Sequence, residues 1–266
     1  MKFYLTKGDI KVDTYRASYY IAAKSENTWE NNWKGQFRGN DVCGNWYSTM
    51  DDNISVVKKS WTTLRSPAKS RYETDGDQNT TYGLDGMDIF LHCGHSGLKS
   101  VGRVMNARWN MWEDGDDGNG TWVFSSNMRL GDEARELKLF STYGCYQLNN
   151  DDADRWSVRW GQIFRGGLKY VTGFHELAWL NSTETQKNKD VGIDYANYLN
   201  TSTKTIKYAW WDAVKSFDDN APAVMVTGSD SSNADTRRDY CRMNTLQTYN
   251  LYRDGDIGAN AWTEWR

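Results

Sequence analysis

Two side chains that could act together on a carbonyl group each follow a short apolar run. His95 lies near the end of the run within residues 87–97, and Cys145 ends the run within residues 136–145. Each run is typical of a strand that enters a glycine-marked turn. Functional groups of an open parallel sheet gather at the carboxyl ends of its strands. If the two strands are neighbours, His95 and Cys145 face each other, and the imidazole can activate the thiol as a nucleophile.

The elements that would hold these two residues alternate between strands and helices along the chain. This alternation predicts an α/β domain with a mostly parallel central sheet. We find no internal repeat and no linker, so residues 1–266 are predicted to form a single domain. Residues 52–64 fit either a strand or a short helix, and the last 38 residues are not assigned. The expected strands are residues 17–23, 87–92, 136–142, 168–174 and 223–228. The expected helices are one capped at Asn40–Asp41, one capped at Asp151–Asp154 that runs through Phe164, and residues 183–199 and 203–217.

The composition excludes some partners and bears on the compartment. A net charge of -3 with 25% charged residues gives no electrostatic basis for binding nucleic acid or an anionic membrane. No apolar stretch approaches the roughly 20 residues that cross a bilayer, and the N-terminus lacks the apolar core of a signal peptide. We therefore expect a cytoplasmic protein. The 14 Trp and 16 Tyr residues are common in extracellular carbohydrate-handling proteins, so secretion stays open.

The four cysteines form no CxxC pair, and a chain of 266 residues does not need a disulfide framework. Free thiols in a reducing compartment are therefore expected. Free cysteine is among the most buried residue types, so Cys43, Cys93 and Cys241 are expected to be packed and inert. His92, inside the first strand, is expected to be a buried histidine of the sheet.

The two apolar runs resemble the segments that carry the catalytic dyad of the caspase-like cysteine peptidases. That clan includes caspases, legumains, gingipains and clostripain-type enzymes. The resembling segments are Ile89–Gly97 and Leu139–Cys145, and their reactive residues are 50 positions apart, as is described for caspases. The resemblance covers residues 85–175. It implies a three-layer α/β sandwich, in which helices flank a mostly parallel sheet, and an endopeptidase activity.

By this resemblance, Cys145 is the nucleophile and His95 is the general acid/base that protonates the leaving amine. The main-chain N–H groups of Cys145 and Ser96 would bind the oxyanion of the tetrahedral intermediate. The reaction needs no metal or other cofactor, and the substrate would be a peptide or a protein. Gly94 and His175, which also stand at strand ends, are further candidates for lining the same crevice.

Two departures from the family pattern keep other functions open. Ser96 stands where the clan usually has glycine, and Tyr146-Gln147-Leu148 stands where caspases have a small residue and glycine. A second hypothesis is therefore a caspase-like binding module without catalytic activity. A third is a carbohydrate-active protein that uses Trp platforms and a pair of carboxylates, which composition alone supports.

An acidic, glycine-rich stretch, Asp114–Gly120, lies between the two expected strands. It fails the EF-hand pattern, because its fifth position is Gly118 and its sixth is Asn119. We interpret it as a solvated turn and leave a calcium site of another kind open. Together with the residues from Asn106 onwards, it predicts a mobile surface loop that could serve as a lid or a processing site.

Overall fold

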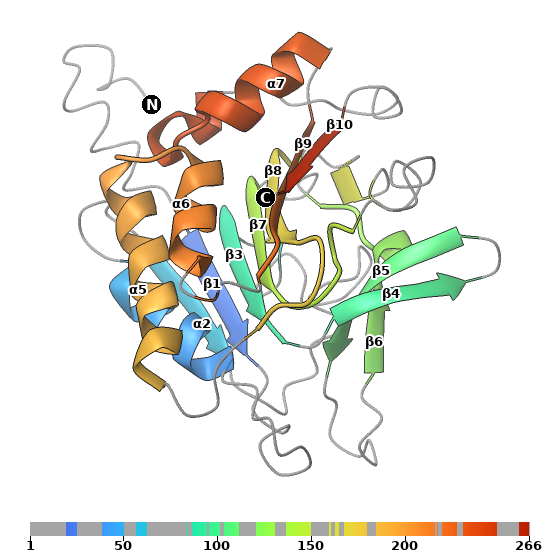
Figure 1. The fold of residues 1–266 in the computed structure, drawn as a ribbon, viewed down its shortest axis with the longest axis horizontal. Coiled ribbons are helices and arrows are strands. Elements are labelled where there is room, and N and C mark those ends of the chain that lie inside the picture. Colours follow the sequence, from blue (N-terminus) through green and yellow to red (C-terminus); the bar gives the residue numbers. More distant parts are fainter. Residues whose placement is uncertain are drawn as a thin grey trace.

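The structure, a computed structural model, describes residues 20–25, 39–50, 57–62, 84, 87–94, 96–101, 104–111, 121–130, 137–149, 160, 163–164, 168–179, 185–215, 217, 220–227, 231–248 and 261–265. Within these residues, the strands form a seven-stranded sheet and a separate three-stranded sheet (Figure 1). The chain is therefore an α/β protein, as predicted.

The larger sheet is mostly parallel, as the alternation of strands and helices predicts. Its strand order is β10-β9-β8-β7-β3-β1-β2. Strands β1, β2, β3, β7 and β8 run in one direction, whereas β9 is antiparallel to β8 and β10 is antiparallel to β9. The strands are β1 (Tyr20–Ser25), β2 (Val57–Thr62), β3 (Ile89–Cys93), β7 (Leu139–Tyr143), β8 (Tyr170–Phe174), β9 (Pro222–Thr227) and β10 (Ala261–Trp265).

The two strands that lead to the candidate dyad are direct neighbours, which confirms their predicted adjacency. Their parallel register runs from Ile89 opposite Leu139 to Cys93 opposite Tyr143. Every residue of both strands is buried. A parallel strand covered on both faces has a nearly continuous apolar run, which explains why these segments show no polar alternation.

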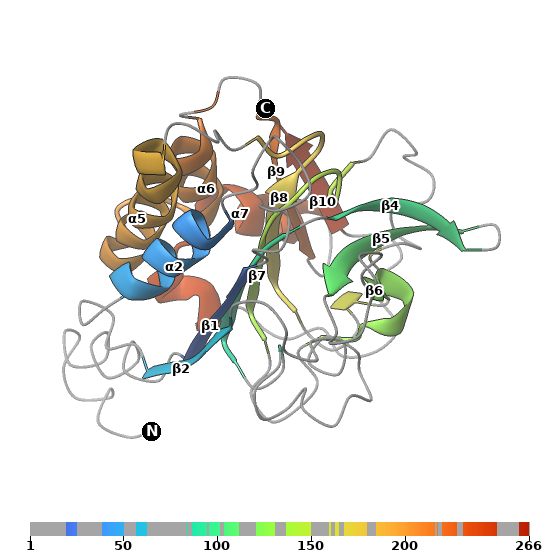
Figure 2. The ribbon, with the colours of Figure 1, turned by 90° about the horizontal axis from the view of Figure 1, so that it is seen from below.

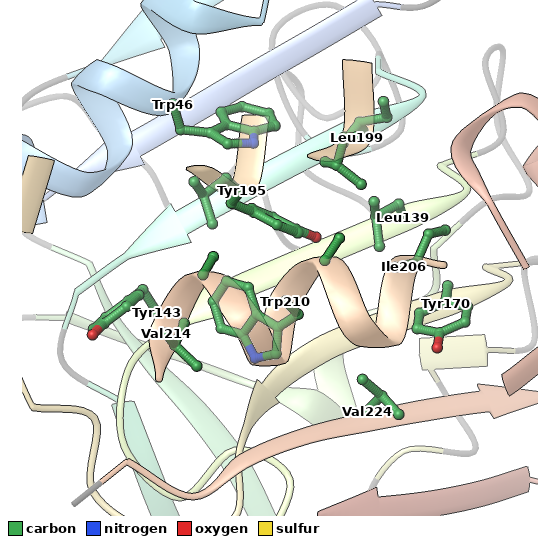
Figure 3. Packing of buried hydrophobic residues seen from close by; sticks show 14 of the residues in the cluster. Trp46, Leu139, Tyr143, Tyr170, Tyr195, Leu199, Ile206, Trp210, Val214 and Val224 are labelled. Carbon is green, nitrogen blue, oxygen red and sulfur yellow. The ribbon is translucent and has the colours of Figure 1, made fainter. Parts of the chain in front are cut away.

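Helices cover one face of the larger sheet (Figure 2). At the centre of this layer, the Trp210 ring lies 5.0 Å from the Tyr195 ring and 6.0 Å from the Tyr143 ring, measured between centroids (Figure 3). The Trp210 indole Nε1–H also donates a 2.8 Å hydrogen bond to the main-chain oxygen of Gly173. Edge-on aromatic contacts and a satisfied indole fix α6 against β7 and β8. The helices are α2 (Gly39–Thr49), α5 (Thr185–Thr201), α6 (Ile206–Val214) and α7 (Ser231–Tyr240).

The three-stranded antiparallel sheet lies on the opposite side of the larger sheet (Figure 2). Trp109 of this small sheet lies 5.6 Å from Phe140 of β7 and 5.7 Å from Trp160 between ring centroids, and all three rings are fully buried. The caspase-like resemblance implies helices on both faces. Among the residues described on this side, only 160, 163 and 164 are α-helical, so strands form much of the cover. These strands are β4 (Ser96–Val101), β5 (Val104–Met111) and β6 (Thr121–Phe124).

The expectation of a mobile surface loop from Asn106 onwards is wrong for its first part. Residues 106–111 belong to β5, which pairs with both β4 and β6. Asn106, Ala107 and Trp109 are buried. A paired strand with a tryptophan in the core cannot be a loose loop. Residues 112–120, which include the acidic stretch, lie outside the described residues.

A disulfide joins Cys43 of α2 to Cys93 at the end of β3, with 6.1 Å between the two Cα atoms. The expectation that all four cysteines are free thiols is therefore wrong for this pair, because α2 packs on the sheet face that Cys93 shares. Cys145 and Cys241 are free. Burial raises the pKa of the Cys241 thiol to about 12, which agrees with the inert role expected for it.

The structure also bears on the other helices and strands expected from the sequence. The predicted helices over residues 183–199 and 203–217 correspond to α5 and α6, and Asn40–Asp41 lies in the first turn of α2. The unassigned C-terminal residues contain α7, a short helix η8 (Met243–Thr248) and β10. Most of the predicted helix over residues 154–164 lies outside the described residues. In the described part of the chain, no helix has the length and apolarity needed to cross a membrane.

Candidate active site

The carboxyl ends of β3 and β7 bring the His95 and Cys145 segments to one edge of the sheet. The last residues paired between the two strands are Cys93 and Tyr143. In both segments a single glycine separates the paired residue from the reactive one. The Gly94 N–H also donates a 3.1 Å hydrogen bond to the Tyr143 main-chain oxygen, so the strands stay joined beyond their last pair.

His95 lies outside the described residues, so a contact between its ring and the Cys145 thiol stays a prediction. Both of its chain neighbours are described, and both bind the Cys145 segment. Gly94 does so through Tyr143, and the Ser96 hydroxyl donates a 2.9 Å hydrogen bond to the main-chain oxygen of Cys145.

The Cys145 thiol is half-buried at the start of the turn that follows β7. The main-chain N–H of Ala178 points at it, with 3.4 Å between the nitrogen and Sγ. Burial raises the pKa of the Cys145 thiol, and the Ala178 hydrogen bond acts in the opposite direction by favouring the thiolate. Because burial is the larger effect, the isolated thiol is neutral near pH 7, and it needs a base to become a nucleophile.

Gly144 shows how closely the two turns approach each other. A methyl group added at this position would overlap the Ser96 Oγ, the Gln147 Nε2 and the main-chain oxygen of Gly94. The overlap includes backbone, which cannot rotate away as a flexible side chain can. Glycine is therefore required here because the start of β4 and the end of β3 lie directly against the Cys145 turn.

The peptide group between Cys145 and Tyr146 is held at both of its polar atoms. Its oxygen accepts the bond from Ser96, and its N–H donates a 2.7 Å hydrogen bond to the main-chain oxygen of Glu176. Tyr146 has a φ of 60°, a left-handed conformation that is uncommon for a residue other than glycine. Such backbone persists only where surrounding contacts over-determine it.

Gln147 is fully buried behind this peptide and links both strands to the small sheet. Its Nε2 donates to the Ser96 hydroxyl and, over 3.0 Å, to the Thr142 hydroxyl of β7. The same Thr142 oxygen accepts a 3.1 Å bond from the Trp109 indole. A further indole, that of Trp160, donates to the main-chain oxygen of Gln147 over 3.1 Å. Sequence reasoning treated Gln147 only as a departure from the caspase pattern, since nothing in the local sequence indicates that this amide is buried.

A second set of hydrogen bonds fixes the segment after β8 against the same turn. The Tyr143 hydroxyl donates a 2.7 Å bond to the main-chain oxygen of Trp179 and accepts one from the Asn220 side-chain amide over 3.2 Å. The Trp179 N–H donates to Asn220 Oδ1 over 2.7 Å. Burial raises the pKa of the Tyr143 phenol, so this hydroxyl stays protonated and remains a donor. The Ala178 N–H that faces Cys145 is thereby held in place.

Large apolar side chains are exposed on both pieces of this edge. Tyr146 and Leu177 are each 37% exposed, and Trp179 is 47% exposed. Tyr146 directly follows Cys145, and the other two flank Ala178. The segment that faces the thiol therefore presents apolar surface to solvent.

The two other histidines of the chain, His92 and His175, are both buried. His175 directly follows β8, which runs parallel to β7, so it lies at the same edge of the sheet as Cys145. Its main-chain N–H donates a 2.9 Å bond to the main-chain oxygen of Ala221. His92 is fully buried within β3, as expected of a sheet histidine.

No three His, Cys, Asp or Glu side chains of the described residues are grouped in a way that could hold a metal ion. The acidic stretch Asp114–Gly120 is outside that set.

Comparisons with known proteins identify a family and a distant likeness to solved structures. A family model described as "Domain of unknown function (DUF6345)" matches residues 59–250. No curated protein matches this chain. Among solved structures, the chain is similar to the Drosophila initiator caspase Dronc, with 8% identity, coverage of 77% of this chain and 78% of that chain, and a TM-score of 0.35.

Proposed function

The chain belongs to the family described as a domain of unknown function, DUF6345, and we propose that it is a cysteine endopeptidase that cleaves peptides or proteins with Cys145 as nucleophile and His95 as general acid/base. One observation carries this proposal. β3 and β7 end side by side in register, and each is followed by one glycine and then by the reactive residue. This arrangement supports a site at the carboxyl edge of a mostly parallel sheet, where a thiol and an imidazole that follow neighbouring strands would act together.

The proposed reaction passes through a thioester. The His95 imidazole takes the proton of the Cys145 thiol, and the sulfur forms a bond to the carbonyl carbon of the substrate. The C–N bond then breaks as the imidazolium gives its proton to the leaving amine. Water next loses a proton to the imidazole and attacks the thioester, the C–S bond breaks, and the proton returns to the sulfur.

The environment of Cys145 supports a dyad over a lone reactive thiolate. Because burial raises the pKa of this thiol, a base must remove its proton near neutral pH. The Ala178 N–H then stabilises the negative sulfur. Activation of a thiol by an adjacent general base is one of the ways in which a cysteine becomes a nucleophile for acyl transfer.

The proposed oxyanion donors are the main-chain N–H groups of Cys145 and Ser96. Ser96 begins β4, and its hydroxyl reaches the Cys145 main chain, so the two residues lie together. One well-placed donor of this kind contributes roughly 3–4 kcal/mol to stabilisation of the transition state. Gly94 and His175, at the ends of the flanking strands, are proposed to line the same edge.

The two other hypotheses receive unequal support. An inactive binding module of the same fold is favoured by the raised pKa of Cys145 and by the exposed Tyr146 beside it. A carbohydrate-active protein needs exposed Trp platforms, and among the described residues only Trp179 is an exposed Trp, whereas Trp46, Trp109 and Trp160 are fully buried. The binding module is therefore the second candidate.

The proposal extends to the fold and the compartment. We infer a single caspase-like α/β domain in which the small sheet β4-β5-β6 replaces part of one helical layer. A cytoplasmic location stays a prediction from the sequence. The Cys43–Cys93 disulfide opposes it, since structural disulfides persist mainly in oxidising compartments.

A peptide-library cleavage profile tests the proposed activity. The wild-type protein should cleave a subset of the library, and Cys145→Ala and His95→Ala should lose cleavage while keeping the wild-type circular dichroism spectrum. Cys241→Ala is the matched control, because it removes a thiol that is buried away from the site. Full cleavage by Cys145→Ala would end the peptidase interpretation. Absence of cleavage by the wild-type protein together with binding of particular peptides would favour the binding module.

A further inference from the structure

The turn that carries Cys145 is left-handed at the next residue, and this conformation needs support from outside the turn. Tyr146 has a φ of 60°. Tyrosine is not favoured there, because its Cβ is crowded by the backbone in a way that glycine avoids. Without external contacts, the turn would relax and carry the thiol with it.

The support on one side comes from a single hydroxyl group. Ser96 Oγ lies 2.9 Å from the Cys145 main-chain oxygen and donates to it. Ser96 follows His95 in the chain, so this bond also ties the segment of the candidate base to the turn of the candidate nucleophile. On the other side, the Tyr146 N–H donates to Glu176 over 2.7 Å. Both polar atoms of one peptide group are thus fixed.

Gln147 fixes the direction in which the Ser96 hydroxyl donates. Its Nε2 donates to Ser96 Oγ, which leaves the hydroxyl hydrogen free to point at the Cys145 oxygen. The amide is itself held by its second bond to Thr142, over 3.0 Å. Gln147 is fully buried, so water does not compete for these bonds.

We propose that Ser96 and Gln147 are positioning residues, whose side chains hold the strained peptide after Cys145 and thereby keep the thiol half-buried and aimed for acyl transfer. This role of the Ser96 side chain is separate from the oxyanion-binding role proposed for the Ser96 main-chain N–H. It gives a function to a hydroxyl at a position where the caspase-like pattern has glycine. The proposal rests on the proposed function for its catalytic consequence, and on the geometry alone for its effect on the thiol.

Alkylation of Cys145 by iodoacetamide tests the effect on the thiol without requiring any peptidase activity. We call the hydrogen bonds from Gln147 to Ser96 and from Ser96 to the Cys145 main chain the clamp. Loss of the clamp should free the turn, expose the thiol and move the raised pKa of the thiol back towards an ordinary value. Ser96→Ala should therefore accelerate alkylation of Cys145 at pH 7.5 by about fivefold, the factor that corresponds to one net hydrogen bond. Ser96→Thr keeps the hydroxyl and should stay within about twofold of the wild-type rate. Gln147→Met, which conserves volume in the core, should resemble Ser96→Ala.

Two internal controls separate the clamp from general loosening. Cys241 is fully buried, so its alkylation reports unfolding, and Ser126→Ala removes an exposed hydroxyl remote in sequence from the turn. Faster alkylation of Cys145 alone supports the proposal. Equal acceleration at Cys241, an unchanged rate in both Ser96→Ala and Gln147→Met, or a faster rate in Ser126→Ala would overturn it.

The catalytic consequence has its own measurement. If the protein cleaves peptides, Ser96→Ala should lower kcat by about fivefold with little change in KM, although its thiol is alkylated faster. Ser96→Thr should restore kcat. Opposite changes in alkylation and kcat are the signature of positioning, and parallel losses would contradict it. A wild-type protein that cleaves no peptide would refute the proposed function. The alkylation rates would still test whether Ser96 and Gln147 hold the Cys145 turn.

Discussion

Reduction of the Cys43–Cys93 disulfide should lower the free energy of unfolding by about 4 kcal/mol. The bond joins residues that are 50 positions apart in sequence, and it connects α2 to the end of β3. A crosslink restricts the unfolded chain, and the chain-entropy relation for a closed loop of about 50 residues gives about 14 cal/mol/K. At 25 °C this corresponds to about 4 kcal/mol, a large part of the 5–15 kcal/mol typical of a folded domain.

Guanidinium unfolding of the oxidised and the reduced wild-type protein measures this difference. The comparison keeps both sulfur atoms in the core, so it isolates the crosslink from the loss of packing that substitution would cause. Cys43→Ala/Cys93→Ala should be at least as unstable as the reduced protein, because it also leaves small cavities. Titration of thiols in denaturant provides the count, which should be two before reduction and four after it.

A protein that shows four free thiols before reduction would refute the pairing. A difference below about 1 kcal/mol between oxidised and reduced forms would refute the energetic reasoning, since it would mean that the reduced chain keeps α2 and β3 together when unfolded.

Two further predictions concern the close packing at Gly144 and the ion pairs of Asp239. Gly144→Ala should destabilise the protein by about 1–3 kcal/mol in chemical unfolding, because the added methyl overlaps backbone. Gly97→Ala should change little, since a methyl there meets no atom within 4 Å. Equal costs at both positions would contradict the packing of the two turns. Bonds from Arg238 and Lys207 lower the pKa of Asp239 to about 2, so its contribution is present above pH 4 and is lost as the pH falls through 2. Asp239→Asn should thus lower stability by about 1 kcal/mol at pH 7, since solvent screens this partly exposed cluster. The variant should approach the wild-type protein as the pH falls below 2, and a difference that persists there would point to another cause.

The adjacency of β3 and β7 could be predicted from the sequence because parallel strands covered on both faces have a recognisable composition. Ile89–Cys93 and Leu139–Tyr143 are short, apolar and followed by glycine, and each is fully buried in the structure. The strand-end position of Cys145 followed from the same pattern. Local sequence was sufficient here because the chain pattern and the fold agree.

Strand β5 was missed although its signal was present. Met105, Ala107 and Trp109 alternate with polar residues, which is the period of a strand with one face in a core. Residues 106–111 were instead predicted as part of a loop, because an acidic, glycine-rich stretch follows them. At this position the alternation of apolar and polar residues predicts the structure better than the composition does.

The disulfide and the buried amide of Gln147 could not be predicted from local sequence. The pairing of Cys43 with Cys93 depends on how α2 lies across the sheet, and Gly192 of α5 contributes to that placement by its close approach to the Val42 main chain. Gln147 is buried because the turn after Cys145 folds back towards Thr142. Both features are properties of tertiary packing, which periodicity does not encode.

A covalent intermediate on Cys145 is the most direct test of the proposed activity. The protein is mixed with a peptide ester whose sequence is taken from the library profile, quenched in acid within seconds, and analysed by intact mass and by mapping of proteolytic fragments. We expect a mass increase equal to the acyl group of the ester less one hydrogen, located on the fragment that contains Cys145. This increase should be absent from Cys145→Ala and should decay as the thioester is hydrolysed. Peptide cleavage without an adduct on Cys145, or an adduct confined to Cys241, would contradict the assignment of Cys145 as the nucleophile.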